Sequence, residues 1–477
     1  MFYNIAVMEK IMDKNIALIG IGPHAKRIYI KLMKKYNVLP KLIVDLDYLK
    51  EDILNYLKKE NIYCDTYFVS KKEANNIELS DDTKKNLSSL IEKYKINYVI
   101  ISTEPKAHFA YAKFFLDHNI NILMDKPITA PIFVFKNKDN VKKIEEEYNV
   151  LKNKYKEKKD SINFIIQCQR RFHVGYRFIK DLVNDTISKY NIPITYLDVY
   201  HSDGMWNMPD EFFSRENHPY KYGYGKLFHS GYHFVDLITW LLESNKLSNK
   251  KTNKMSICTS VFKPIDFFKT LDNDFYKKYL KTNKYENILN DSEKVKDYGE
   301  LDIHSMIEFK KDDILITHCN LNLLQSGFSK RSWCELPQDT YKSNGRVRHE
   351  HINIQIGPIM NIQVHSYQSV EINEKSNIKN YDVGSIDHFD IYIFRNNNLI
   401  GGKPFEKISI NELMDKNDFL GNNEKARELC FLEFLENKKS ESDLLNHEDS
   451  ILLLTKLCES ILKKDKKIHS LWGDINE

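Results

Sequence analysis

The chain has 477 residues, of which 42% are hydrophobic, and this length exceeds what one hydrophobic core ordinarily accommodates. We therefore expect two domains. Its 71 lysines and arginines nearly cancel its 67 aspartates and glutamates, and the resulting net charge of +4 argues against a nucleic-acid-binding surface. No window approaches the roughly 18 uncharged apolar residues that a membrane span needs, and the N-terminus lacks a basic start followed by an apolar core.

The seven cysteines are odd in number and far apart, and no two of them form a Cys-x-x-Cys pair. This pattern argues against a zinc or redox site and favours reduced thiols. We therefore expect a soluble, unprocessed cytoplasmic protein that binds neither nucleic acid nor a membrane.

The first predicted element is a buried strand, because an apolar Ile-Ala-Leu-Ile run follows Asn15 and ends at a glycine. A helix is predicted next, from Ala25 to Lys35. The turn between them reads Gly20-Ile-Gly-Pro-His-Ala25, the pattern G-x-G-x-x-A, and the next apolar run, 41–44, ends in Asp45. A strand, this turn, a helix and an acid after the second strand are typical of a dinucleotide-binding unit.

The small residues of this turn have separate physical roles. Gly20 permits the tight turn, Gly22 lets the backbone approach a pyrophosphate, and Ala25 lets the helix pack close to the strand. The helix N-terminus offers free N–H groups to phosphate oxygens. Asp45 is expected to accept hydrogen bonds from a ribose 2′-hydroxyl and to repel a 2′-phosphate, which favours NAD over NADP. The alternative is that Asp45 is solvated and Asp47 has this role.

Strands and helices continue to alternate along the next eighty residues. Helices are predicted over 49–60, 81–95 and 108–117, and strands over 67–69, 97–102 and 121–124. This alternation predicts a parallel sheet, in which ligands bind beyond the carboxyl ends of the strands. The triplet Asp125-Lys126-Pro127 follows the last of these strands, and the proline restricts Lys126 to an extended conformation. Lys126 is therefore expected over the cofactor crevice.

Four segments together resemble one family. They are the G-x-G-x-x-A turn, Ser-Thr-Glu-Pro-Lys-Ala-His at 102–108, the Asp-Lys-Pro triplet, and Gly-Tyr-Gly-Lys-Leu-Phe-His-Ser-Gly-Tyr-His-Phe-Val-Asp at 223–236. The last three are similar to T-P-x-x-x-H, E-K-P and G-G-G-x-L-x-D-x-G-x-H-x-x-D of the glucose-fructose oxidoreductase, inositol dehydrogenase and rhizopine-catabolism (Gfo/Idh/MocA) family.

The resemblance implies an α/β fold with two domains. Residues 12–128 would form a Rossmann domain with a doubly wound parallel sheet. Residues 129–477 would form a substrate-binding α/β domain on a large, open, mixed or antiparallel sheet, which in the family often makes the subunit contact of a homodimer or homotetramer. The implied activity is NAD(P)-dependent hydride transfer at a carbinol carbon of a sugar, nucleotide-sugar or cyclitol.

The resemblance also implies residue roles. Hydride removal from a secondary alcohol leaves a hydroxyl that must lose its proton, so a base or proton relay must lie within hydrogen-bond reach. Lys126 and His233 match the family's catalytic lysine and histidine, and burial beside another cation would lower the pKa of the lysine. The alternatives are an exposed Lys126 paired with Asp125 and a His233 satisfied in the core. The cofactor contacts implied are Gly20, Gly22, Pro23, His24, Ala25, Asp45, Ser102, Thr103, Pro105, His108, Asp125 and Lys126.

His229 stands where the family usually has an aspartate, and Tyr224 also departs from the pattern. On a helix, His229 and His233 would share one face. Three hypotheses remain for His229: it contacts substrate and assists the catalytic pair, it is a packing replacement in a protein with weakened chemistry, or it binds a metal with His233 and Asp236. A neutral His229 would leave His233 with an ordinary pKa.

Further substrate contacts are expected after the strand predicted at 194–200. Trp206 could lie against a sugar face, with Asp203 or Asn207 on its hydroxyls. Arg171 could meet an acidic sugar. A core or surface tryptophan and a structural salt bridge of Arg171 are the alternatives.

The remainder of the chain predicts the second sheet. Residues 244–297 are interpreted as an insertion with short helices. Strands are predicted over 300–309, 313–324, 347–356, 362–367 and 387–394, and helices over 423–437 and 449–464. His349 and His351 would share one strand face. Two rival functions remain open: a non-catalytic cofactor or sugar sensor, and a lyase or glycosidase that uses bound NAD transiently.

Overall fold

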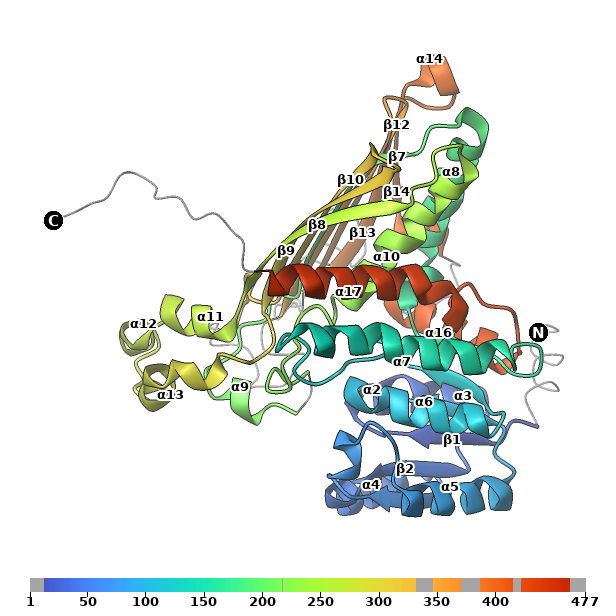
Figure 1. The fold of residues 1–477 in the computed structure, drawn as a ribbon, viewed down its shortest axis with the longest axis vertical. Helices are drawn as coiled ribbons and strands as arrows, with labels where there is room; N and C mark the ends of the chain where they lie inside the picture. The colour runs from blue at the N-terminus through green and yellow to red at the C-terminus, as the bar shows by residue number, and fades with distance from the viewer. Residues whose placement is uncertain (1–12, 217, 332–345, 370–386, 415–421, 464–477) are drawn as a thin grey trace.

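The structure, a computed structural model, describes residues 13–216, 218–331, 346–369, 387–414 and 422–463. Two sheets organise these residues, one in the blue N-terminal part of Figure 1 and one above it. None of the described helices is both long and apolar enough to cross a lipid bilayer.

The N-terminal sheet has six parallel strands in the order β3-β2-β1-β4-β5-β6. All residues of β1 and β4 are buried, as expected for strands covered on both faces. The predicted Rossmann fold is therefore confirmed. The strands are β1 (Ile16–Ile19), β2 (Leu42–Leu46), β3 (Asp65–Val69), β4 (Tyr98–Ile101), β5 (Asn121–Met124) and β6 (Phe164–Ile166).

Most helices of this domain follow the predicted ranges, but one is interrupted and α7, over residues 138–156, was not predicted. The helix expected over 25–35 is divided at Ile28, whose ψ of −69° departs from the helical value, although its N–H still donates to the carbonyl of His24 at 2.9 Å. The sheet also continues past residue 128, because β6 lies beyond it; the domain boundary at 128 stays a prediction. The helices are α2 (Pro23–Arg27), α3 (Tyr29–Lys35), α4 (Lys50–Lys59), α5 (Asp81–Tyr94), α6 (His108–Asp117), α7 (Lys138–Lys156) and α16 (Asn422–Leu435).

The second sheet has eight strands in the order β14-β13-β12-β11-β7-β10-β9-β8. Only the β7–β10 pair is parallel, so the predicted large mixed sheet is confirmed. The strands are β7 (Ile194–Ser202), β8 (Lys254–Phe262), β9 (Asp302–Lys311), β10 (Ile314–Leu324), β11 (Val347–Ile356), β12 (Met360–Ser369), β13 (Asp387–Arg395) and β14 (Phe405–Ser409).

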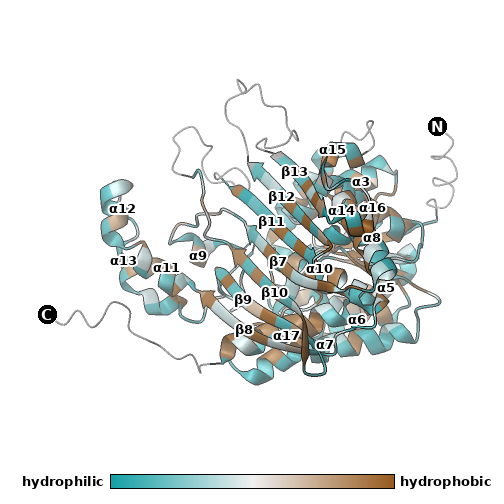
Figure 2. Ribbon diagram, turned by 90° about the horizontal axis from the view of Figure 1, so that it is seen from above, coloured by the Kyte–Doolittle hydropathy of each residue, from teal (hydrophilic) through white to brown (hydrophobic). Residues whose placement is uncertain are grey.

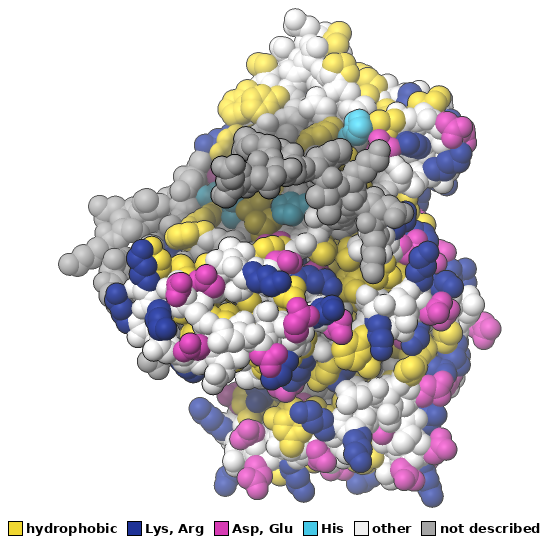
Figure 3. Space-filling model, turned by 60° about the vertical axis from the view of Figure 1, so that its left-hand side comes forward, with side chains coloured by type: hydrophobic (Ala, Val, Ile, Leu, Met, Phe, Trp, Pro, Cys, Tyr) yellow, Lys and Arg dark blue, Asp and Glu magenta, His cyan; other side chains and the backbone are white. Residues whose placement is uncertain are grey.

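The two faces of this sheet have different environments. One face packs on α8 (Val174–Tyr190), α10 (Tyr232–Leu242) and α17 (Glu448–Leu462), and no described helix covers the other, which we call the open face; hydrophobic and polar residues accordingly alternate along the strands (Figure 2). In β11, Ile352 and Ile354 are buried whereas His349 is exposed. His349 and His351 thus share the open face, and Figure 3 shows histidine side chains on this side of the molecule.

The segment 244–297 differs in part from the prediction. It contains the short helices α11 (Pro264–Thr270), α12 (Asn273–Tyr279) and α13 (Glu286–Asn290), but also β8, the edge strand of the large sheet. Alternate residues of β8 are exposed and several are polar, which weakens its strand pattern in the sequence. The helices and α9 (Glu211–Ser214) extend from one end of the sheet around a small aromatic core of their own (Figure 1).

Candidate active site

A cavity of about 770 Å³ lies where the carboxyl ends of the six parallel strands meet the second sheet. One wall comes from the segments after β1, β2, β4 and β5. The other comes from the turn before α10 and from the ends of β7, β11 and β12. This volume is within the range of about 300 to 1,000 Å³ that small-molecule and cofactor sites occupy.

The glycine turn after β1 has the geometry that dinucleotide binding requires. Gly20 has φ +86°, and a Cβ there would lie 2.5 Å from the Ser102 carbonyl oxygen, so only glycine fits. A Cβ on Gly22 would meet no atom within 4 Å, so the backbone there is open to the cavity. Pro23 and His24 also line the cavity, whereas Ala25 is buried behind the turn, where its small size allows close packing.

Asp45 lines the cavity at the end of β2, and Asp47 does not. The Asp45 carboxylate accepts hydrogen bonds from the backbone N–H groups of Ile21, at 2.6 Å, and Leu46, at 2.7 Å. Burial raises the pKa of this carboxyl above its ordinary value, although both hydrogen bonds oppose the shift. Asp45 therefore connects the second strand to the glycine turn.

The ends of β4 and β5 are joined through Asp125. Its carboxylate accepts from Ser102 Oγ at 2.6 Å and from the Tyr29 hydroxyl at 2.5 Å. Asp125, Ser102, Thr103 and Pro105 all line the cavity.

His108, an expected cofactor contact, does not line the cavity. It is fully buried, with Nδ1 2.7 Å from the Pro127 carbonyl oxygen and Nε2 3.2 Å from that of Thr103. Burial lowers the pKa of His108, so the ring is neutral and its one N–H can donate to one of these carbonyls. The structure therefore places His108 between two loops and not among the cavity-lining residues, in contrast to the cofactor contact predicted for it.

Lys126 extends into the cavity, where its ammonium donates a hydrogen bond to the His229 carbonyl oxygen rather than pairing with Asp125. The Lys126–Pro127 peptide bond is cis. Burial lowers the pKa of Lys126 to about 8, and the charge of Asp125 only partly opposes this shift. An amine with this pKa can both lose and accept a proton near neutral pH.

His233 lies in the first turn of α10 and lines the same cavity. Its Nδ1 is buried without a hydrogen-bond partner among the described residues. Burial and, next, the charge of Lys126 hold the pKa of His233 well below its ordinary value. The expectation of an ordinary pKa is therefore wrong: His233 is a neutral imidazole because it is buried beside cations.

His229 lies in the turn before α10, which begins at Tyr232, so His229 and His233 do not share a helix face. Both ring nitrogens of His229 are buried without a hydrogen-bond partner in the described part of the chain. Its ring centroid lies 4.8 Å from that of His218 and 5.3 Å from that of Tyr220, and all three line the cavity. Substrate contact by His229 stays a prediction.

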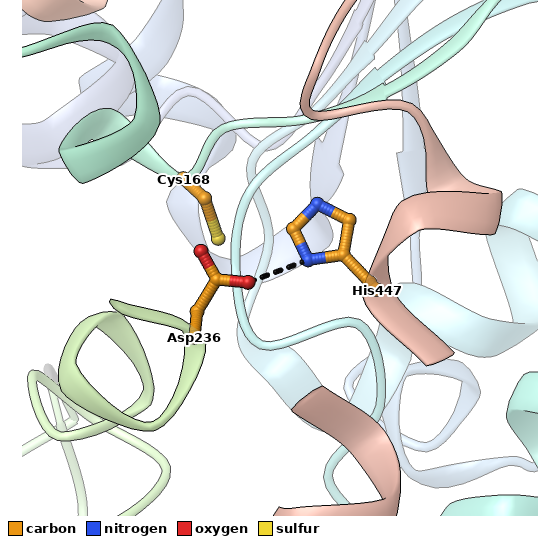
Figure 4. A group of neighbouring side chains, drawn as sticks. All are labelled: Cys168, Asp236 and His447. Carbon is orange, nitrogen blue, oxygen red and sulfur yellow. Dashed lines mark ion pairs between the residues drawn. The ribbon is translucent and has the colours of Figure 1, made fainter. Parts of the chain in front are cut away.

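Asp236, which the metal-binding alternative for His229 and His233 would need as a ligand, does not line this cavity. It accepts from Arg171 Nε at 3.0 Å and Nη2 at 2.7 Å, and it lies 2.9 Å from His447 Nδ1. Cys168 completes a buried group with Asp236 and His447 (Figure 4). The Arg171 cation already neutralises the carboxylate, so the arrangement is that of a structural ion pair rather than a metal centre.

Two expected substrate contacts are wrong. Arg171 is only 2% exposed and is bound to Asp236, so the structural salt bridge is what the structure shows. Trp206 does not line the cavity and packs instead on Phe275, with ring centroids 6.0 Å apart. Asn207 accepts from Arg215 at 2.5 Å, outside the cavity lining.

Asp203 does line the cavity, but within a network that the sequence did not reveal. Lys226 is fully buried, and its Nζ lies 2.6 Å from Asp203, 2.8 Å from Ser230 Oγ and 3.0 Å from His201 Nδ1. The position of Lys226 inside the 223–236 motif was the only available signal. Of this network, His201, Asp203 and Ser230 line the cavity together with His229 and His233.

Comparisons with known proteins agree with this arrangement. Residues 14–154 match the model of the oxidoreductase family GFO_IDH_MocA, with an NAD-binding Rossmann fold. The resemblance inferred from the motifs is thereby confirmed for these residues. A search of curated proteins finds no match.

Solved structures with the same fold include three oxidoreductases. A levoglucosan dehydrogenase in complex with NADH is 13% identical, with a TM-score of 0.56 and coverage of 94% of this chain and 96% of that chain. An oxidoreductase from Agrobacterium radiobacter, in complex with NAD+, L-tartaric acid and magnesium, is 11% identical, with a TM-score of 0.53 and coverage of 94% and 96%. A 3-ketoreductase from Actinomadura kijaniata, in complex with NADP and TDP-benzene, is 9% identical, with a TM-score of 0.50 and the same coverage.

Proposed function

We propose that this protein is an NAD-dependent oxidoreductase that transfers a hydride between nicotinamide and a carbinol carbon of a sugar, nucleotide-sugar or cyclitol. The observation that supports this most is the convergence of Lys126 and His233 on the cavity that the glycine turn also lines. These three features come from different parts of the chain, and a hydride transfer with proton removal needs all three.

The described residues fit the dinucleotide. Gly22 leaves the backbone open to a pyrophosphate, and Asp45 is placed to accept from a ribose hydroxyl. The nicotinamide would supply hydride acceptance or donation. Because both NAD and NADP are bound by proteins of this fold, the preference for NAD rests on Asp45.

Lys126 and His233 would handle the proton of the substrate hydroxyl. Neutral Lys126 can accept this proton, and its ammonium form can stabilise the developing alkoxide. Burial keeps His233 neutral. Either ring nitrogen, Nδ1 or Nε2, would then form a hydrogen bond with the substrate hydroxyl and position it. The hydrogen bond from Lys126 to the His229 carbonyl joins the β5 end to the turn before α10, and this supports the proposal that Lys126 and His233 would act on the same substrate hydroxyl.

The open face of the second sheet would make the contact between subunits of a homodimer or homotetramer. This proposal is supported by the size of the open face and by the rings along it, such as His349, His351 and Tyr367. Size-exclusion chromatography with light scattering tests it.

The experiment that tests the function has two stages. NAD binding is measured first by calorimetry, and NADH formation is then followed at 340 nm over a panel of sugars, nucleotide-sugars and cyclitols. Formation of NADH with one of them supports the proposal. NAD binding with no turnover would favour a sensor, and conversion of a substrate without net NADH would favour a lyase or glycosidase.

A further inference from the structure

One carboxyl group that lines the cavity, that of Glu104, differs from the others there. It lies in the segment after β4, and its Oε2 is buried with neither a hydrogen-bond partner nor an ion pair in the part of the chain that the structure describes. The five other described carboxyl groups of the lining are each held by a donor or a cation of the chain. The pairs are Asp45 with the Ile21 N–H, Asp125 with Ser102, Asp203 with Lys226, Glu216 with Lys221, and Glu350 with Arg170.

The local backbone fixes the position of Glu104. Pro105 restricts the residue before it to an extended conformation, and Glu104 has φ −60° and ψ 139°. Its carbonyl oxygen accepts a hydrogen bond from the Ala107 N–H at 3.0 Å. The neighbouring Lys106 forms no ion pair with the Glu104 carboxylate, because its ammonium donates to the Asn75 side chain instead.

The surroundings of Glu104 disfavour its charge. Burial raises the pKa of Glu104 to about 7, and the charge of Lys106 opposes this shift only in part. Buried polar groups of folded proteins nearly always have a hydrogen-bond partner, since an unpartnered group is unfavourable. A carboxyl group left in this way on a cavity wall indicates that a ligand supplies the donor.

The order of the strands indicates which part of a dinucleotide would lie there. Strand β4 lies between β1 and β5, with neighbouring strands about 5 Å apart. The end of β4 is in close contact with the glycine turn, because a Cβ on Gly20 would lie 2.5 Å from the Ser102 carbonyl oxygen. In a dinucleotide, the second ribose links the pyrophosphate to the nicotinamide. A cofactor with its pyrophosphate at the glycine turn and its nicotinamide at Lys126 would therefore bring this ribose to the end of β4.

We propose that the Glu104 carboxylate accepts hydrogen bonds from the hydroxyls of the ribose next to the nicotinamide. Asp45 would have the equivalent role for the adenosine ribose, so each ribose would have its own carboxylate. This inference rests on the proposed function and adds a cofactor-binding residue that the sequence motifs did not predict.

Three ligands of increasing length test this contact by binding alone. ADP contains only the adenosine ribose, ADP-ribose adds the second ribose, and NAD adds the nicotinamide. In calorimetric titrations of the full-length protein, Glu104→Gln should bind ADP normally. It should bind ADP-ribose and NAD about 10-fold more weakly, because a neutral amide replaces a charged acceptor. Normal ADP binding also shows that the variant is folded.

Glu78→Gln is the matched control. Glu78 belongs to the same domain, is exposed, forms an ion pair with Lys113 and lies outside the cavity lining. This variant should bind all three ligands as the unaltered protein does.

The other patterns of affinity overturn the proposed contact. Equal weakening of ADP, ADP-ribose and NAD by Glu104→Gln would place its effect outside the second ribose. Weakening of NAD alone would assign the carboxylate to the nicotinamide carboxamide. Unchanged affinity for ADP-ribose and NAD would free Glu104 for the substrate, and this result would leave the proposed function standing.

A separate measurement distinguishes failure of this inference from failure of the proposed function. If Glu104→Gln weakens ADP-ribose as expected but the unaltered protein forms no NADH with any compound of the panel, the proposed function is contradicted and the Glu104 contact stands. If the unaltered protein binds none of the three ligands, both are contradicted.

Discussion

Helix α10 carries two polar side chains, the half-buried His233 and the fully buried Asp236, less than one turn apart, and their surroundings are opposite. His233 lines the cavity with a nitrogen that has no partner among the described residues. Asp236 is 0% exposed and accepts from Arg171 and from Ser450 Oγ at 2.9 Å, with His447 beside it. One helix thus contributes to a binding cavity and to the structural framework.

This difference gives a criterion that separates ligand-binding residues from structural residues in this protein: whether the polar atoms have hydrogen-bond partners. Buried polar groups are normally hydrogen-bonded, because an unmet group costs about 1 to 3 kcal/mol. The Asp236 carboxylate accepts from Arg171 and Ser450, and Arg171 also donates to the Glu441 carbonyl, so the group stabilises the junction of α10 with the β6 end and the 440–447 segment. Around His229 and His233 ring nitrogens are left for a ligand.

The largest effect on turnover is expected for the two cavity residues that would act on the substrate proton, Lys126 and His233. Lys126→Met and His233→Ala should each lower turnover by about 10² to 10⁴-fold and leave NAD affinity nearly unchanged, because both groups act on the substrate proton. The measurement is steady-state kinetics with NAD titration of each variant. Full activity of Lys126→Met would remove the lysine from the chemistry.

For the structural ion pair of Asp236 and Arg171, we expect a substitution to lower the stability of the fold. Asp236→Asn should destabilise the fold by about 3 to 5 kcal/mol at pH 7, because it leaves the Arg171 charge buried without its carboxylate. The pKa of Asp236 is lowered in the fold by Arg171 against the opposing effect of burial, so its contribution is present above the unfolded pKa of about 4 and is lost as pH falls below it.

Denaturant unfolding at pH 7 and at pH 2.5, well below the unfolded pKa, measures this effect. The destabilisation by Asp236→Asn should be smaller at the lower pH. Asp313→Asn is the control, because that carboxylate is exposed, and it should leave the midpoint of unfolding unchanged. Unaltered stability of Asp236→Asn would mean that the ion pair is not part of the framework.

An intermediate effect is expected at the cofactor end. Asp45→Ser should narrow the difference between NAD and NADP binding by about 1 to 3 kcal/mol, because it removes a ribose contact and a repulsive charge. Asp47→Ser, which alters an acid outside the cavity, should change neither affinity. Calorimetric titration with NAD and with NADP measures this difference in affinity. Tighter binding of NADP than of NAD by the unaltered protein would contradict the role of Asp45 as the ribose contact.

The smallest effect is a change with pH. Since Lys126 has a pKa of about 8, it is protonated at lower pH and cannot accept the substrate proton. The kcat/KM of alcohol oxidation should therefore rise about tenfold per unit as pH increases toward 8 and level off above it. In Lys126→Met this titration should be absent. A profile that instead levels off near pH 6.5 would point to a histidine with an ordinary pKa.

The sequence determined the first five strands of the N-terminal sheet, but not β6 or the helix α7. Its apolar runs form β1, β4 and β5, which are buried on both faces and therefore have unbroken hydrophobic patterns. Gly20 and Lys126 line the cavity because turn geometry and the carboxyl edge of a parallel sheet constrain them locally. Short-range rules were sufficient wherever the nearest neighbours in sequence decided the conformation.

Tertiary structure alone decided the substrate end of the cavity. Arg170 and Arg171 are adjacent in one short 3₁₀ turn, yet Arg170 lines the cavity and Arg171 is bound to Asp236. Such a turn has no long periodicity from which the direction of a side chain can be predicted. Arg427 reaches the same cavity from a helix about 300 residues beyond Lys126, because α16 packs against the N-terminal domain. Contacts between residues so far apart in the sequence depend on how the two sheets pack together, and no local sequence pattern predicts that packing.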